Sequence, residues 1–172
     1  MIDAKHDADS EIRSLDELEA IFHAGGKPRG QWKIGVEYEK PVVDRRSGQT
    51  VPYDGDPGIE AVLKAMLEAP EWRGVYENDK LIALQDGAAS ITLEPGGQLE
   101  MSGRLCDSLH CAADELDDHV KQLLAVGEKL GVFFLALGIV PKTPISRCPW
   151  MPRPATNSCV GSCKPTGPWG IA

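Results

Sequence analysis

The chain has 172 residues, of which 42% are hydrophobic and 26% charged, a composition typical of a folded globular domain. Its formal net charge of -8 disfavours nucleic acid and anionic membranes as partners, because both would repel it. No apolar run approaches the roughly 20 residues of a membrane-spanning helix. These properties indicate one domain, or part of a larger one, and we expect a cytoplasmic location.

The first predicted element is a short helix. Residues 1–13 are polar and acidic and are interpreted as a mobile leader. Ser14 followed by Glu17 is a capping box, and the apolar stripe after it predicts a helix that packs through this stripe and ends near Gly25. We therefore expect the domain to begin at residue 14.

A strand and a second helix are predicted next. Alternation over residues 32–39 indicates a strand with Glu37 and Glu39 on one face. Asp56 before Pro57 is typical of a helix N-terminus. The buried stripe expected for that helix comprises Ile59, Val62, Leu63, Met66 and Leu67.

Three further strands are indicated by turn chemistry. The Asp86-Gly87 pair between apolar residues 80–84 and 89–93 predicts a β-hairpin. A third strand is expected over residues 99–102, after a turn with two adjacent glycines. Antiparallel strands mixed with packing helices give an α+β fold with a mainly antiparallel sheet.

A long amphipathic helix is predicted over residues 107–130 and a buried strand over residues 132–140. His110 and His119 are expected at solvent or boundary positions of this helix. Its inward residues are expected to be Leu109, Ala113, Leu116, Val120, Leu123 and Leu130.

All five cysteines lie in the second half of the chain. An odd number without a secretory signal predicts reduced thiols, and we interpret Cys106 and Cys111 as buried thiols. Zinc ligation by cysteine and histidine is disfavoured, because none of the spacings forms a CxxC pair.

Two glutamate pairs carry the strongest chemical signal. Glu37 and Glu39 lie two residues apart on one strand, and Glu94 and Glu100 flank the diglycine turn. Carboxylates this close favour a hard cation such as Mg²⁺, which could bridge an acidic protein to ATP. The sequence contains no Gly-x4-Gly-Lys-Ser/Thr phosphate loop. Taken alone, the first pair fits an exposed strand face with two solvated glutamates better than a metal site, and the second is an ordinary hairpin loop.

Four ordered segments carry a family resemblance. Residues 33–40, 51–55, 89–103 and 149–152 read KIGVEYEK, VPYDG, ASITLEPGGQLEMSG and PWMP. Together they resemble the N-terminal part of glutamate–cysteine ligases of the plant and proteobacterial type. The longest segment is the most specific of the four.

The resemblance implies a glutamine-synthetase-like catalytic fold, in which the sheet forms one wall of an open funnel. It implies that Glu37, Glu39, Glu94 and Glu100 bind Mg²⁺, and that ATP, glutamate and cysteine are the substrates. In such an enzyme the glutamate γ-carboxylate attacks ATP to give γ-glutamyl phosphate, and the cysteine amine then displaces phosphate, which is the first step of glutathione biosynthesis. The resemblance identifies no other catalytic residue.

Residues 153–172 do not resemble the family and contain many helix breakers. The resemblance therefore implies that residues 14–152 are the N-terminal part of the ligase catalytic domain. A frameshift is our hypothesis for this tail, because the codons permit a family-like continuation in a displaced frame. We therefore expect an incomplete enzyme that is inactive alone. Two alternatives remain open, namely another carboxylate–amine ligase of the same fold and a non-catalytic fragment that binds metal or a protein partner.

Overall fold

The computed structural model describes residues 11–152, so the predicted tail over residues 153–172 and most of the predicted leader lie outside the described residues. The chain divides into two compact units, Met1–Trp32 and Lys33–Ala172. No helix among the described residues is long and apolar enough to cross a lipid bilayer.

The first unit contains helix α1 (Leu15–Gly25) and the short 3-10 helix η1 (Arg29–Gln31). The predicted capping box is confirmed, because the Ser14 side chain accepts a hydrogen bond from the Glu17 backbone N–H. No residue of α1 is buried, so this unit provides no cover for the apolar stripe that we expected to pack.

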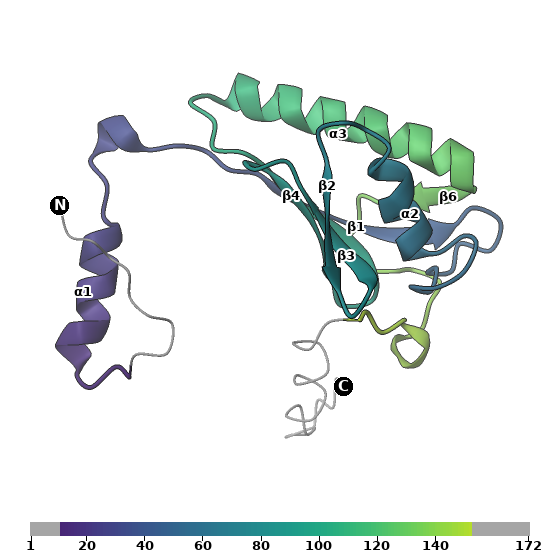
Figure 1. The fold of residues 1–172 in the computed structure, drawn as a ribbon, viewed down its shortest axis with the longest axis horizontal. Helices are drawn as coiled ribbons and strands as arrows, with labels where there is room; N and C mark the ends of the chain where they lie inside the picture. Colours follow the sequence, from purple (N-terminus) through teal and green to yellow (C-terminus); the bar gives the residue numbers. More distant parts are fainter. Residues whose placement is uncertain (1–10, 153–172) are drawn as a thin grey trace. The chain divides into compact units, whose positions relative to one another are not determined.

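The second unit is a six-stranded sheet with two longer helices (Figure 1). The strands are β1 (Glu37–Asp44), β2 (Arg73–Glu77), β3 (Lys80–Gln85), β4 (Ser90–Glu94), β5 (Gln98–Ser102) and β6 (Val132–Phe134). Their order is β2-β3-β4-β5-β1-β6, and every neighbouring pair is antiparallel. The helices are α2 (Ile59–Met66), α3 (Leu109–Leu130) and the 3-10 helix η2 (Ile145–Arg147). The predicted α+β class with a mainly antiparallel sheet is confirmed.

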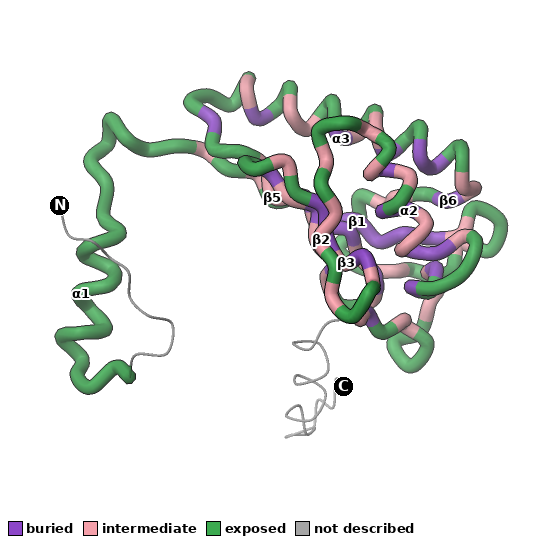
Figure 2. The backbone as a smooth tube through the Cα atoms, viewed as in Figure 1, coloured by how far each residue is buried: buried purple, intermediate pink, exposed green. Residues whose placement is uncertain are grey.

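The hydrophobic core lies between the sheet and helices α2 and α3 (Figure 2). Strands β4 and β5 alternate strictly, with Ile91, Leu93, Leu99 and Met101 buried and the residues between them only half-buried. The predicted stripe of α2 is confirmed at four positions, Ile59, Val62, Leu63 and Met66. One face of the sheet is therefore covered by helices.

Strand β1 begins and ends later than the strand predicted over residues 32–39. Just before Glu37, Ile34 forms an isolated bridge with Cys106, and the Val36 carbonyl accepts a hydrogen bond from the Gly103 N–H. From Lys40 to Val43 the strand is buried, and its last residues pair with β6. The polar turn after residue 44 obscured this buried half in the sequence.

Strand β2 was not predicted, and two other elements were given wrong bounds. The signal for β2 is the Asn78-Asp79 pair, whose positive φ angles of 47° and 63° form a tight turn into β3. Helix α2 begins after its N-cap Gly58 rather than at Asp56. The buried strand expected over residues 132–140 is wrong beyond β6. Leu135 donates its N–H to the Pro41 carbonyl, but Pro41 has no N–H to donate in return, so the ladder stops.

Helix α3 ends where predicted and begins two residues later, and its predicted inward face is confirmed in part, because Leu123 is buried and Leu116 and Leu130 pack against the core. Ser108 caps its N-terminus and Gly131, in the left-handed conformation, ends it. Leu109 is exposed and His119, expected near solvent, is buried. The residues that are buried are Ala112, His119, Leu123, Val126 and Gly127.

Cys106 and Cys111 form a disulfide, so the prediction that both are free thiols is wrong. The cap at Ser108 turns the first residues of α3 back toward the end of the preceding loop. The Cα atoms of Cys106 and Cys111 thereby lie 5.7 Å apart, within the range that a disulfide spans. Sequence spacing alone gave no indication of this local turn.

Candidate metal-binding face of the sheet

The four glutamates predicted from the sequence lie on one face of three adjacent strands. Glu39 of β1 is directly opposite Glu100 of β5, and Glu37 is opposite Ser102. Glu94 of β4 is opposite Gln98, which is two residues from Glu100. Because residues in register share a face, all four carboxylates are on the face that α2 and α3 do not cover.

Polar side chains on this face hold two of the carboxylates. The Gln98 amide Nε2 donates to Glu39 Oε2 at 3.4 Å, and the Ser102 hydroxyl donates to Glu100 Oε1 at 2.9 Å. Glu37 and Glu39 are exposed, whereas Glu94 and Glu100 are half-buried. The face therefore presents oxygen ligands that remain accessible from solvent.

The turn between β4 and β5 requires its two glycines. Gly96 and Gly97 have φ angles of +82° and +79°, which residues with a Cβ rarely adopt. A Cβ at Gly97 would also lie 3.3 Å from Met151 Cε. This tight turn places Glu94 and Glu100 on the neighbouring strands β4 and β5.

The donor set on this face suits Mg²⁺ better than a softer metal, because it consists of carboxylate, amide and hydroxyl oxygens. Like charges directly opposite each other, as at Glu39 and Glu100, are unfavourable unless a cation lies between them. Within residues 11–152, no three His, Cys, Asp or Glu side chains are already close enough to hold a metal ion.

Two titratable residues are buried on the opposite, helix-covered side. Lys40 is 4% exposed and His119 is 6% exposed. Burial lowers the pKa of Lys40 to about 8. Burial, together with the positive charge of Lys40, lowers the pKa of His119 to about 4, so the imidazole is neutral at pH 7.

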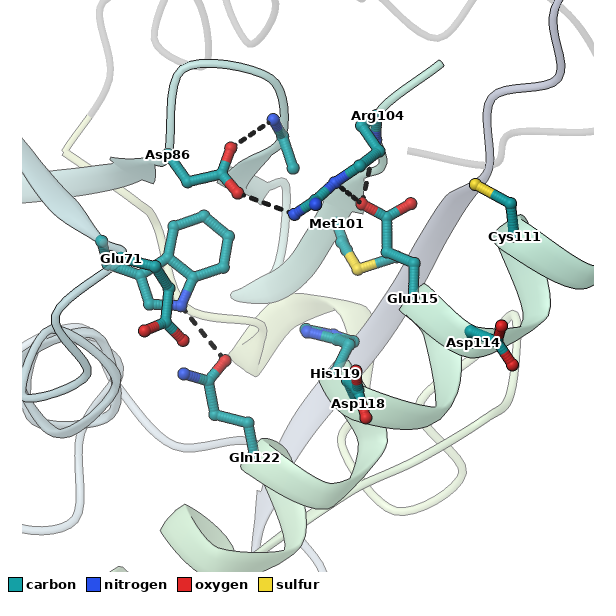
Figure 3. Close-up of a pocket in the computed structure, with 12 residues that line it drawn as sticks. Glu71, Asp86, Met101, Arg104, Cys111, Asp114, Glu115, Asp118, His119 and Gln122 are labelled. Carbon is teal, nitrogen blue, oxygen red and sulfur yellow. Dashed lines mark hydrogen bonds and ion pairs between the residues drawn. The ribbon is translucent and has the colours of Figure 1, made fainter. Parts of the chain in front are cut away.

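A pocket of about 690 Å³ lies between the sheet and α3, away from the carboxylate face (Figure 3). Arg104 bridges two carboxylates there, donating from Nη2 to Asp86 at 2.9 Å and from Nε to Glu115 at 3.0 Å. Burial would raise the pKa of Asp86, but backbone hydrogen bonds from Ala89 and Ala88 and the charge of Arg104 lower it. The sequence analysis did not identify this network, whose members are far apart along the chain.

Comparisons with known proteins agree with the resemblance. Residues 33–170 match the family described as glutamate-cysteine ligase family 2 (GCS2). This range continues past Pro152 into the segment that we expected to lie outside the family.

Several plant proteins align with 144 residues, or 84%, of this chain. Glutamate–cysteine ligase A, chloroplastic, of Oryza sativa subsp. japonica is 37% identical, and the alignment covers 29% of that protein. The chloroplastic glutamate–cysteine ligases of Brassica juncea and Arabidopsis thaliana are 38% and 37% identical, with 27% of each covered. The chain thus spans less than a third of the length of these relatives. It belongs to the glutamate–cysteine ligase family.

Proposed function

We propose that the open face of the sheet contributes the metal-binding part of a glutamate–cysteine ligase active site. The observation that carries this proposal is the register that sets Glu39 against Glu100, with Glu37 and Glu94 on the same face. Such a cluster of oxygen ligands on an acidic protein fits Mg²⁺ with a bound nucleotide. We further propose that the sheet is one wall of a glutamine-synthetase-like funnel.

The reaction proposed for the whole enzyme has two steps. The γ-carboxylate of glutamate attacks the γ-phosphorus of ATP, which releases ADP and gives γ-glutamyl phosphate. The cysteine amine then attacks the activated carbonyl, and phosphate leaves as the amide bond forms. Bound Mg²⁺ would supply charge neutralisation on the phosphates.

Two sets of residues on the open face of the sheet would hold and orient the metal ion. Glu37, Glu39, Glu94 and Glu100 would hold Mg²⁺. Gln98 and Ser102 restrict the carboxylates of Glu39 and Glu100 through their hydrogen bonds. Such outer contacts commonly tune metal affinity.

Two alternatives make different predictions. Another carboxylate–amine ligase would use the same face with a different acid or amine, and a non-catalytic fragment would bind metal without turnover.

The cytoplasmic location expected from the sequence stays a prediction, since the relatives named above are called chloroplastic.

The test is an assay for γ-glutamylcysteine and phosphate release with ATP, glutamate and cysteine, using a protein that extends this chain to the full length of the family. Glu94→Gln should keep the fold and sharply reduce turnover, because it removes a negative ligand with little change in volume. Glu77→Gln, on β2, is the matched control and should retain activity. Turnover by Glu94→Gln with normal Mg²⁺ dependence would remove Glu94 from the site.

A further inference from the structure

The pocket between the sheet and α3 has an acidic lining (Figure 3). Carboxylates outnumber positive charges among the side chains that line it, because its imidazole is neutral at pH 7 and its cation is Arg104. The carboxylates belong to Glu71, Asp86, Asp114, Glu115 and Asp118. A lining of this charge favours a cationic ligand over an anionic or neutral one.

Arg104 compensates part of this charge. Its guanidinium is ion-paired with Asp86 and Glu115 at the same time, so one cation serves two carboxylates. The remaining three carboxylates are on exposed residues of α3 and of the loop before β2, namely Asp114, Asp118 and Glu71. The accessible side of the pocket is therefore the acidic one.

The imidazole of His119 lies in the wall of this pocket without a hydrogen-bond partner. His119 is 6% exposed, and its Nδ1 has no such partner among residues 11–152. Figure 3 shows the ring directed from α3 into the pocket. A buried polar group without a partner is costly. Because a neutral imidazole accepts a hydrogen bond at one ring nitrogen, a ligand that carries an N–H group would satisfy it.

The pocket is elongated along α3. Its lining residues on this helix extend from Cys111 to Gln122, at spacings of three and four residues that place them on one helix face. A helix of that length spans roughly 16 Å. Trp72 and Met101 supply apolar surface opposite, and the Trp72 indole is held by its hydrogen bond to Gln122 at 3.2 Å. The volume of about 690 Å³ is typical of small-molecule sites.

We propose that this pocket binds a short linear polyamine, with one ammonium group donating to the His119 imidazole and the others facing the exposed carboxylates. The methylene groups of such a ligand would contact Trp72 and Met101. A metal ion fits less well, because within the described part of the chain no three His, Cys, Asp or Glu side chains are close enough to hold one. The pocket lies away from the open face of the sheet, so this proposal does not rest on the proposed function.

Titration of the ¹⁵N-labelled 172-residue chain with spermidine, at pH 7 and constant ionic strength, tests the site. We expect saturable shifts of the Trp72 indole N–H and the His119 imidazole signals, because both side chains line the pocket. An uncharged aliphatic diol of similar length should shift neither signal. Absence of saturable shifts with spermidine, or equal shifts with the diol, would overturn the proposal.

Two neighbouring aspartates provide matched variants for the same titration. Asp117 and Asp118 are both exposed and both ion-paired with Lys121. Of these two described residues, Asp118 lines the pocket and Asp117 does not. Asp118→Asn should weaken spermidine binding about threefold, as expected for an exposed ion pair. Asp117→Asn changes the net charge equally and should leave the affinity unchanged. Equal affinities of the two variants would contradict a site in this pocket.

Discussion

At the scale of single residues, alternation along strands was enough to predict the shared face of the glutamates. Glu37 and Glu39 are two residues apart, and Glu94 and Glu100 are related by a tight turn, so local rules determine their faces. The burial of Lys40 and His119 was not predictable in this way. It depends on how α3 is rotated against the sheet, which is a property of tertiary packing.

His119 should make stability depend on pH. Its folded-state pKa of about 4 lies below its ordinary value of 6.5, so the folded chain resists protonation. The contribution of the neutral imidazole to the free energy of unfolding is complete above about pH 6.5. It is lost as the pH falls toward 4, by an amount on the order of 3 kcal/mol. Urea unfolding at pH 7 and pH 4.5 measures this loss, and His119→Asn serves as control for the other titrating groups. Identical pH dependence in both proteins would contradict the assignment.

The two turn glycines should respond differently to alanine. Gly96→Ala introduces only backbone strain, because a Cβ at this position would have no atom within 4 Å, and should cost about 1 kcal/mol of unfolding free energy. Gly97→Ala adds a contact at 3.3 Å with Met151 Cε and should cost more. Chemical denaturation of both variants provides the comparison. A larger loss for Gly96→Ala would show that Met151 does not restrict the turn.

At the scale of elements, the sequence predicted best where a local signal marks both ends. The β3–β4 hairpin follows from its Asp-Gly pair, and α3 from its cap and periodic apolar residues. The sequence-based prediction missed β2 and gave β6 too great a length. Strand β6 pairs with β1 over three residues and stops before Pro41, which has no N–H to continue the ladder, and pairing with a distant strand leaves no local pattern.

The N-caps of α1 and α3 offer a matched pair of substitutions. Both Ser14 and Ser108 accept a backbone N–H hydrogen bond, at 3.1 and 3.3 Å. Ser108→Ala should lower the unfolding free energy of the second unit by about 1 kcal/mol, because α3 covers its core. Ser14→Ala should leave that free energy unchanged, because α1 belongs to the other unit and buries no residue. Equal losses in urea unfolding would show that α1 contributes to the core.

At the scale of the whole molecule, the family match and the fold divide the chain at the same place. The match begins at residue 33, where the second compact unit also begins. The sequence analysis placed this boundary earlier, at residue 14, because the capping box gave the first clear element. The net charge of -8 was informative at this scale, since it requires cations to mediate any contact with phosphates.

Removal of residues 1–32 should therefore leave the second unit intact. We expect the shortened chain to unfold at the same urea concentration as the 172-residue chain, because no residue described before residue 33 belongs to the hydrophobic core. Circular dichroism during urea titration measures this. A marked fall in the midpoint would show that the first unit stabilises the second.

The central claim is that the open face of the sheet binds the metal ion. Titration of the ¹⁵N-labelled chain with Mn²⁺ tests it most directly, because paramagnetic broadening identifies the nearest backbone amides. We expect broadening centred on Glu39 and Glu100, lost in Glu100→Gln and retained in Asp117→Asn, whose carboxylate is ion-paired with Lys121 on α3. Broadening centred instead on the acidic surface of α3, or unaffected by Glu100→Gln, would contradict the account.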